Sequence, residues 1–474
     1  MVETATKLLE ADEVSVREAL ASMIETKDVI VDNEVVYLPP FYYAEDGSAK
    51  RLDTLLKAID SGDYSIAAEP EMEYGSTPSG IVYDDVQQAA IQKALDSKVM
   101  VLTGGPGTGK TTTTQGIIEA FKARKKTILL AAPTGRAAKR MTEATGMEAK
   151  TIHRLLEYSP MEGYKRNDEN PLEGDVLIVD ECSMIDILLF YNLMKAIPEK
   201  MRLILIGDID QLPSVGAGNV LRDIIDSNKI PVVRLTRIFR QAQTSRIVMN
   251  AHAINAGNFP NIQNGHETDF FFIKQENPDE IVKLIIGLVR DRLSKRYGYP
   301  PKEIQVLTPM QRGTVGAANL NIELQNALNP SGPSLTRGGY TYRQGDKVMQ
   351  IRNNYDKSVF NGDIGYITAV DTNERTLNVT FDSRLVEYDV SELDELVLAY
   401  AVTIHKSQGS EFPVVVMPVT MKHFVMLQRN LIYTGITRAK KICVLVGTTK
   451  ALAYAIHNQT VSKRNTKLKD RLKL

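Results

Sequence analysis

The sequence contains little cysteine and little histidine, and it has no long apolar run. Its 474 residues include 2 cysteines and 6 histidines. Cys182 and Cys443 both lie in or beside apolar, strand-like runs, which argues against a disulfide framework and favours a reducing compartment. No apolar run approaches the roughly 18 residues of a membrane-spanning helix, and the N-terminus resembles neither a signal nor a transit peptide. We therefore expect a cytoplasmic protein without a membrane anchor.

Acidic and basic residues nearly balance, but they are distributed unevenly. The formal net charge is −1. Residues 1–80 hold 6 Lys and Arg against 17 Asp and Glu, a net of −11, so the remainder holds 51 against 41, a net of +10. A basic body suits a polyanionic partner. The tail from Lys463 to Lys473 is also strongly basic, which fits either a solvated terminal helix or another contact with such a partner.

The most informative motif is a glycine-rich loop that follows an apolar, strand-like run at Val99–Leu102. The loop has the pattern G-x-x-x-x-G-K-[ST], and its residues are Gly104, Gly105, Pro106, Gly107, Thr108, Gly109, Lys110 and Thr111. Thr112 begins the helix expected to run to Arg124. Backbone N–H groups and the helix N-terminus favour a polyphosphate here, with Lys110 at the β- and γ-phosphates and the Thr111 hydroxyl on Mg²⁺. The motif predicts that the chain binds a nucleoside triphosphate.

At 474 residues the chain is long enough for about three domains of ordinary size. Residues 14–27 have a helical pattern, and two short apolar runs flank Asp32-Asn33, so a helix followed by a hairpin is expected, as in a winged-helix module. Pro39-Pro40 is expected to close this module. Residues 69–80 are rich in Glu, Gly, Ser and Pro and read as a linker. The first region is therefore placed at residues 1–80.

Strands alternate with helices through most of the remaining chain, which predicts an α/β fold with parallel sheets. The first series runs from 81 to about 255, and the second occupies 256–474. A stretch of short alternating runs at 345–397, with the hairpin signal Asn361-Gly362, predicts a five-strand β-barrel inserted into the second series. The strands expected in the first series are Val99–Leu102, Thr127–Ala131, Val176–Val179, Leu203–Ile206 and Val232–Leu235.

Polar residues that follow two of these strands are candidate catalytic groups. Asp180 and Glu181 end the strand at Val176–Val179. Asp180 can hold Mg²⁺ opposite Thr111, and Glu181 can orient and deprotonate the attacking water. Gln211 follows the next strand, where a γ-phosphate sensor belongs, although a surface turn is the alternative. Arg240 and Arg438 are candidate arginine fingers, although most arginines serve only to solvate a surface.

The order of motifs from Tyr83 to the C-terminus resembles superfamily 1 helicases, specifically the RecD-like subgroup of 5′→3′ DNA helicases. The resemblance covers about four-fifths of the chain. One departure is Cys182, at a position where the family commonly has Ala. The matching segments are Tyr83–Ala90 with Gln87 (Q motif), Ala132–Ala138 (motif Ia), Thr151–Leu156 (motif Ib), Asp180–Met184 (Walker B), Thr403–Glu411 (motif V) and Tyr433–Lys440 (motif VI).

This resemblance implies two RecA-like parallel-sheet domains of the P-loop NTPase class, at 81–255 and 256–474. It also implies an SH3-like barrel, a β-hairpin insertion at 157–173, and a role for the hairpin in splitting duplex DNA. An ordinary surface loop is the alternative for that insertion. ATP would lie between the domains, contacted by Gln87, residues 104–112 and Glu411. Single-stranded DNA would lie along the opposite edge, contacted by Pro133, Thr134, Arg136, His153, Thr308, His405 and Ser407.

The expected function is an ATP- and Mg²⁺-dependent DNA helicase that moves 5′→3′ on single-stranded DNA and unwinds duplex carrying a 5′ single-stranded tail, in DNA repair or recombination. We expect a monomeric motor with protein partners at the N-terminal module. Because the helix-and-hairpin pattern starts near residue 13, we expect the further N-terminal region of long RecD-like enzymes to be absent or to have been removed. Two alternatives stay open: an ATP-dependent RNA translocase, and a non-catalytic nucleic-acid-binding subunit. Six intact groups argue against the latter: Lys110, Thr111, Asp180, Glu181, Gln211 and Arg438.

Overall fold

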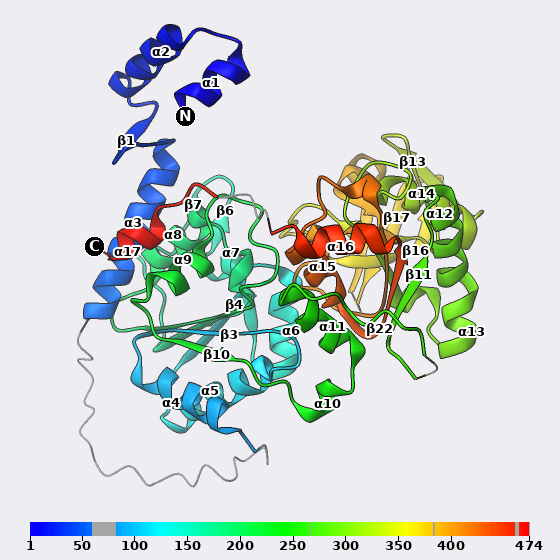
Figure 1. The fold of residues 1–474 in the computed structure, drawn as a ribbon, viewed down its shortest axis with the longest axis horizontal. Coiled ribbons are helices and arrows are strands. Elements are labelled where there is room, and N and C mark those ends of the chain that lie inside the picture. The colour runs from blue at the N-terminus through cyan, green and yellow to red at the C-terminus, as the bar shows by residue number, and fades with distance from the viewer. Residues whose placement is uncertain (59–81, 266, 383, 460–463, 474) are drawn as a thin grey trace.

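The computed structural model describes residues 1–58, 82–265, 267–382, 384–459 and 464–473 (Figure 1). Two parallel sheets with helices packed around them form the body of the molecule, a small antiparallel sheet lies beside the second, and a helical module forms the N-terminus. The predicted α/β fold class is confirmed. Among the described residues, no helix has both the length and the apolar character that a membrane span needs.

The first sheet has six parallel strands in the order β10-β3-β9-β8-β4-β5. All five strands predicted in this region are present, and β5 is an additional edge strand. β8 is apolar and buried along its whole length, and β3 is so over Val99–Leu102, as expected where helices cover both faces. The strands are β3 (Val99–Gly104), β4 (Ile128–Ala132), β5 (Ala149–Thr151), β8 (Val176–Val179), β9 (Arg202–Gly207) and β10 (Val232–Leu235).

Separate apolar cores form on the two faces of this sheet. On one face, Ile91 of α4 (Asp85–Asp96) and Phe121 of α5 (Lys110–Ala123) pack with Met100 of β3. On the other, α8 (Ile187–Ala196) and α9 (Val220–Ser227) bury apolar side chains against the same strands. Since the strands are parallel, their carboxyl ends share one edge. The loops at this edge are the expected location of a ligand site.

The second sheet has five parallel strands in the order β11-β22-β21-β12-β20. Its strands are β11 (Phe270–Lys274), β12 (Ile304–Thr308), β20 (Ala401–Thr403), β21 (Phe412–Val419) and β22 (Ala439–Gly447). Apolar side chains from two groups of helices enter the cores on its two faces. One group comprises α11 (Arg246–Asn255), α15 (Arg429–Ile436) and α16 (Thr449–His457), and the other comprises α12 (Pro278–Gly287), α13 (Leu293–Tyr297) and α14 (Ala317–Leu328).

The predicted all-β insertion is a five-stranded antiparallel sheet in the order β18-β17-β16-β15-β19. Its core also contains Leu335 and Tyr342 of the preceding hairpin, so the insertion begins before the predicted residue 345. That hairpin turns at Gly338-Gly339, whose positive φ angles of 58° and 81° favour glycine. Asn361-Gly362 does form a turn, but within the long β15–β16 connection. The strands are β13 (Ser334–Arg337), β14 (Tyr340–Arg343), β15 (Lys347–Gln350), β16 (Ile364–Asp371), β17 (Thr376–Phe381), β18 (Arg384–Asp389) and β19 (Leu396–Leu398).

The N-terminal module contains α1 (Val2–Leu9), α2 (Glu13–Glu25), the hairpin β1 (Ile30–Asp32) and β2 (Val35–Tyr37), and α3 (Pro39–Lys57). The predicted helix and hairpin are present. Pro39-Pro40, expected to close the helix and hairpin, follow β2 and form the first turn of α3, where the missing N–H of proline costs no helical hydrogen bond. The winged-helix interpretation stays a prediction, and the predicted linker at 69–80 lies outside the described residues.

The C-terminal helix α17 (Leu468–Lys473) returns to the first sheet and lies against α3 (Figure 1). Leu468 and Leu472 are buried in the core on that side of the first sheet. Arg471 donates hydrogen bonds to Asp32 (2.5 Å) and Asp46 (3.4 Å), and only 12% of its side chain is exposed. The end of the tail is therefore packed against the protein. It is not the solvated terminal helix that the sequence allowed as one interpretation.

A short antiparallel hairpin occupies the predicted insertion in the first domain. It consists of β6 (Tyr158–Ser159) and β7 (Gly163–Tyr164). Met161 at its tip is 95% exposed. At its base, His153 contacts the rings of Tyr158 and Tyr164, with centroid separations of 5.5 and 5.9 Å. The hairpin is thus an exposed projection with an aromatic base.

Candidate active site

The phosphate loop joins the buried strand β3 to helix α5 in the predicted way. Gly107 and Gly109 have φ angles of 72° and 82°, a left-handed conformation that glycine adopts without strain. Gly109 is the N-cap residue of α5, which begins at Lys110. The Lys110 ammonium donates to the carbonyl oxygens of Gly104 and Gly105, so it is folded over the loop that is to receive phosphate.

Asp180 and Glu181 follow β8, and their environments differ. Burial and the neighbouring Glu181 charge raise the pKa of Asp180 to about 6. Burial alone would also raise the pKa of Glu181, but the positive charges of Arg140, Arg438 and Lys110 outweigh it and lower that pKa. The φ of Glu181 is 53°, a turn that directs the chain away from the strand. The positive charges around Glu181 favour its ionised form, which a general base requires.

One pocket of about 230 Å³ brings together groups from both halves of the protein. Lys110, Thr111, Asp180 and Glu181 line it from the first sheet, whereas Glu411 and Lys440 line it from the second. Thr111 and Asp180 offer one hydroxyl and one carboxylate oxygen. Such hard oxygen donors fit Mg²⁺, which usually keeps waters and phosphates as its other ligands. No group of three or more His, Cys, Asp or Glu suited to a metal occurs in the described residues.

Asp208, after β9, is a buried acceptor that sequence analysis missed. It is 2% exposed and accepts hydrogen bonds from the Tyr433 hydroxyl at 2.7 Å and from the Gln211 amide at 3.3 Å. Tyr433 belongs to α15, so this bond crosses between the domains. Leu212 adds a second crossing, since its N–H donates to Thr434 at 2.9 Å. The position of Asp208 at a strand end was the only signal in the sequence.

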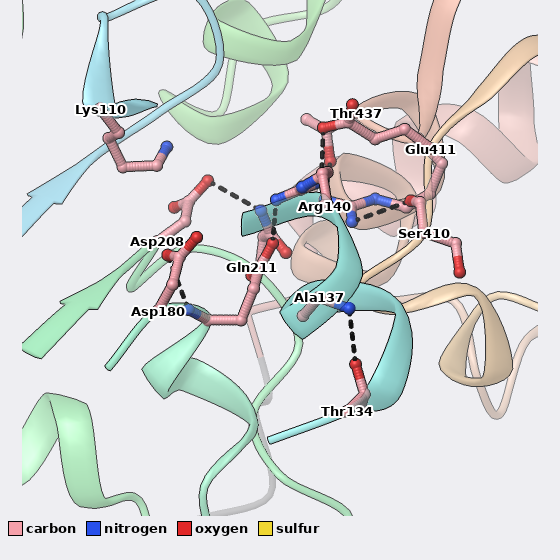
Figure 2. Close-up of polar contacts among 12 residues, drawn as sticks. Lys110, Thr134, Ala137, Arg140, Asp180, Asp208, Gln211, Ser410, Glu411 and Thr437 are labelled. Atoms are coloured by element: carbon pink, nitrogen blue, oxygen red, sulfur yellow. Dashed lines mark hydrogen bonds and ion pairs between the residues drawn. The ribbon is translucent and has the colours of Figure 1, made fainter. Parts of the chain in front are cut away.

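Arg140 is a second missed residue. It lies on α6 (Gly135–Thr145), and its guanidinium donates to Glu181 and to Glu411, each at 2.7 Å (Figure 2). Burial opposes its charge, but these two carboxylates and Asp180 outweigh that effect and raise the pKa of Arg140 further above its ordinary value. Its partners are distant in the sequence, which explains why no local pattern identified it.

Of the two candidate arginine fingers, Arg438 is the one whose side chain the structure describes. Arg438 is 2% exposed, and it donates to the carbonyl oxygens of Thr434 and Ser410, each at 3.2 Å. Its charge acts on Glu181 across the cleft. Arg240 begins α10 (Arg240–Gln243), but its side chain lies outside the described part of the structure.

Gln87 lies beside the phosphate loop, as predicted, but its amide is already engaged. Its side-chain oxygen accepts from the Asp84 N–H at 3.1 Å, which completes a capping box at the start of α4, and its nitrogen reaches the Gly109 carbonyl at 3.5 Å. Contact with the adenine base stays a prediction, since it requires this amide to exchange partners.

Several residues predicted to contact DNA lie near the junction of the two domains. Thr134 caps α6, where its hydroxyl accepts from the Ala137 N–H at 3.3 Å, and it lies against Gly409 of the second domain (Figure 2). Arg136 donates to the Ser410 hydroxyl at 2.9 Å. His153 and His405 are half-buried, and burial lowers the pKa of each. Pro133 is also half-buried.

Two of the predicted DNA contacts do not fit the structure. Thr308 is fully buried, and its hydroxyl donates to the Val315 carbonyl at 2.7 Å. Ser407 is likewise fully buried, with its hydroxyl donating to Ile404 at 2.7 Å. Both hydroxyls are used inside the fold, so neither side chain is available to a strand on the surface.

The fold has two all-parallel α/β domains, and the first carries a phosphate loop. Both domains line one pocket. These features define a P-loop NTPase with two RecA-like domains and a candidate nucleotide cleft between them. Residues 87–217 match an AAA domain family. Residues 320–381 match the SH3 domain of ATP-dependent RecD-like DNA helicases, and residues 398–446 match the C-terminal domain of UvrD-like helicases.

Similar curated proteins are RecD proteins. The RecBCD enzyme subunit RecD of Mycobacterium tuberculosis is 30% identical over 91% of this chain and 79% of its own length. The ATP-dependent RecD2 DNA helicase of Deinococcus radiodurans is 35% identical over 92% of this chain, which spans 58% of that relative's length. A crystal structure of a Bacteroides Pif1 helicase with ADP-AlF3 and single-stranded DNA has a TM-score of 0.48 and 20% identity, covering 78% of this chain and 94% of that one. The chain belongs to the RecD family of helicases.

Proposed function

We propose that this chain is an ATP-driven motor that translocates 5′→3′ along single-stranded DNA and unwinds the duplex ahead of it. The observation that carries the proposal is the pocket lined by Lys110, Thr111 and Glu181 from one domain and by Glu411 and Lys440 from the other. A nucleotide bound in such a pocket contacts both domains at once. Binding then favours closure of the cleft, and loss of the γ-phosphate favours opening.

The residues of the cleft divide the hydrolytic chemistry among them. Lys110 neutralises the β- and γ-phosphates, and Glu181 orients the attacking water and accepts its proton. Thr111 and Asp180 hold Mg²⁺, which when bound neutralises charge on the phosphate oxygens. Arg438, held by the carbonyl oxygens of Thr434 and Ser410, stabilises charge that develops on the transferred phosphoryl group, together with Arg240. Gln211 senses the γ-phosphate through Asp208.

We place the single strand at the edge that bears Thr134, Arg136, His153 and His405. Hydroxyl, guanidinium and imidazole groups can contact phosphate and sugar without reading the bases, which suits a motor that moves along any sequence. The net of +10 outside residues 1–80 supports a polyanionic partner. The domain limits that accompany this function are 1–80, 81–255 and 256–474, with a monomeric motor whose N-terminal module contacts protein partners.

Stimulation of ATP hydrolysis by DNA and by RNA tests the substrate. We expect single-stranded DNA to stimulate turnover and an RNA of the same sequence to do so much less. Equal stimulation would support an RNA translocase, because recognition would then tolerate the 2′-hydroxyl. No turnover with either polymer, in the presence of Mg²⁺, would support a non-catalytic nucleic-acid-binding subunit.

A further inference from the structure

Helix α6 touches one loop of the second domain at two successive helical turns. Arg136 donates to the Ser410 hydroxyl at 2.9 Å, and Arg140, four residues later, donates to the Glu411 carboxylate at 2.7 Å. Residues four apart lie on the same side of a helix. This side of α6 therefore faces the second domain across the cleft.

Arg140 links two carboxylates that belong to different domains. Its Nη2 donates to Oε1 of Glu181 and its Nη1 to Oε1 of Glu411, both at 2.7 Å (Figure 2). The Glu181 side chain is 7% exposed, whereas those of Arg140 and Glu411 are each 31% exposed. A planar guanidinium with several N–H groups can serve two acceptors at once, which an ammonium group on a single carbon cannot do in the same geometry.

The other end of α6 lies at the proposed DNA edge. Thr134 is its N-cap residue, and a side-chain carbon added at Gly409 would lie only 2.7 Å from the Thr134 hydroxyl, so the second domain approaches closely there too. From Thr134 to Arg140 the helix rises about 9 Å. A rigid element thus joins the strand-binding edge to the nucleotide pocket (Figure 2).

We propose that Arg140 is a positioning residue that couples DNA binding and closure of the cleft to the availability of the catalytic base Glu181. In the closed cleft Glu411 holds one side of the guanidinium, so Arg140 occupies only Oε1 of Glu181. When the domains separate, Glu411 withdraws, and both N–H edges of Arg140 can turn to Glu181. Both carboxylate oxygens of Glu181 are then hydrogen-bonded to Arg140, and neither can hold the attacking water. The proposal rests on the proposed function.

The remaining charged groups around Glu181 do not share this arrangement. Lys110 and Asp180 belong to the same domain as Glu181, and Arg438 is held by carbonyl oxygens of its own domain. Lys440 approaches Glu411 at 3.3 Å, also within the second domain. Among these groups, Arg140 is the one whose recorded ion pairs reach a carboxylate in each domain.

The test measures kcat for ATP with and without saturating single-stranded DNA. Arg140→Gln releases Glu181, so we expect the DNA-free kcat to be maintained or increased and the stimulation by DNA to fall by about tenfold, a usual size for coupling between sites. Arg140→Lys keeps a cation beside Glu181 but cannot span both carboxylates, so the DNA-free rate stays low and stimulation is still lost. Glu143→Gln is the matched control on α6, because the exposed Glu143 pairs with Lys139 of the same helix, and its stimulation should equal that of the wild type.

Three results would overturn the proposal. If Arg140→Gln loses the DNA-free and the DNA-stimulated rates equally, Arg140 has only a structural role. If the variant is stimulated by DNA as strongly as the wild type, Arg140 has no role in coupling. If Arg140→Gln fails to fold, Arg140→Lys provides the test through the same ratio of DNA-stimulated to DNA-free kcat. Full stimulation in Arg140→Lys would contradict the bridging geometry. Absence of ATP hydrolysis in the wild-type protein would instead refute the proposed function itself, which keeps the two failures distinct.

Discussion

The six-stranded and five-stranded sheets are both parallel and both contribute to the cleft, yet they contribute different chemistry. The first carries the phosphate loop after β3, Asp180 and Glu181 after β8, and Asp208 after β9. The second contributes Glu411, Tyr433 and Arg438, which lie in the loop before β21 or in and after α15. The first sheet thus has the groups to which we assign phosphate binding and the activation of water. The second has groups that reach them only while the domains are in contact.

This difference teaches how a motor can make hydrolysis depend on domain position. Three contacts cross the cleft close to the catalytic groups: Tyr433 to Asp208, Thr434 to Leu212, and Arg140 to Glu411. Each involves a residue within or close to the catalytic groups. Removing a group of the first sheet should therefore affect nucleotide binding or chemistry directly, whereas removing Arg438, on the side of the second sheet, should affect chemistry far more than binding. The variants below test this division, in order of decreasing effect on ATP turnover.

Lys110→Ala should abolish ATP hydrolysis. The β- and γ-phosphates lose the ammonium group of the loop, while the strand-binding edge is separate and should still bind single-stranded DNA. Steady-state ATPase and a DNA-binding titration measure the two effects. Lys122→Ala, an exposed lysine on the same helix α5, should leave both unchanged. DNA-stimulated hydrolysis near the wild-type rate in Lys110→Ala would contradict the assignment of the phosphate loop.

Arg438→Lys should lower kcat by about 10³-fold or more, the scale expected for losing an arginine finger, with little change in ATP affinity. Lysine keeps the charge but not the planar guanidinium that reaches several oxygens. Single-turnover hydrolysis and a nucleotide-binding titration separate the two quantities, and Lys441→Gln on the exposed start of β22 is the control. If ATP affinity falls as much as kcat, the second sheet contributes to binding and the division between the sheets is wrong.

Glu181→Gln should slow turnover by about 10²-fold or more, the usual scale for losing a general base, and leave ATP and Mg²⁺ binding intact. Nucleotide affinity and single-turnover rates are the measurements. Glu143→Gln, an exposed carboxylate on α6, serves as the control. A collapse of ATP affinity with normal turnover at saturation would make Glu181 a ligand position instead of the base.

Deleting the hairpin tip, residues 160–162, should remove duplex unwinding while leaving ATP hydrolysis stimulated by single-stranded DNA. Translocation needs only the strand-binding edge and the cleft, whereas separation of the strands needs a rigid obstacle at the fork. Each base-pair step costs on the order of 1.4 kcal/mol in stacking to open. Equal loss of both activities would show that the hairpin supports folding or DNA binding. Unchanged unwinding would show that it is a surface loop.

Local patterns predicted the two sheets and the phosphate loop well, because strand burial and glycine spacing are encoded in contiguous residues. The β13–β14 hairpin extends the predicted barrel because its Gly338-Gly339 turn lies outside the stretch of alternating runs. The helix α3 was not predicted, although proline at the start of a helix is common. The roles assigned to individual site residues remain predictions, although all but the Arg240 side chain lie in described regions.

Contacts between distant segments could not be predicted from the sequence. Arg140 meets Glu411 across 271 positions, and Tyr433 meets Asp208 across 225. The fully buried hydroxyls of Thr308 and Ser407 show the opposite error, since a polar residue in a helicase-like motif was assigned to DNA when its partner is a nearby carbonyl. The packing of α17 against α3 likewise depends on tertiary structure, because the basic composition of the tail does not tell which acidic residues it contacts.

The central claim is that this chain is an ATP-driven 5′→3′ DNA helicase. Unwinding of two matched duplexes, identical except that one carries a 5′ and the other a 3′ single-stranded tail, tests it most directly when measured with ATP and Mg²⁺. We predict strand separation of the 5′-tailed duplex, none of the 3′-tailed duplex, and none of either with Lys110→Ala. Unwinding of the 3′-tailed substrate, or of neither substrate by a wild-type protein that hydrolyses ATP, would contradict the claim.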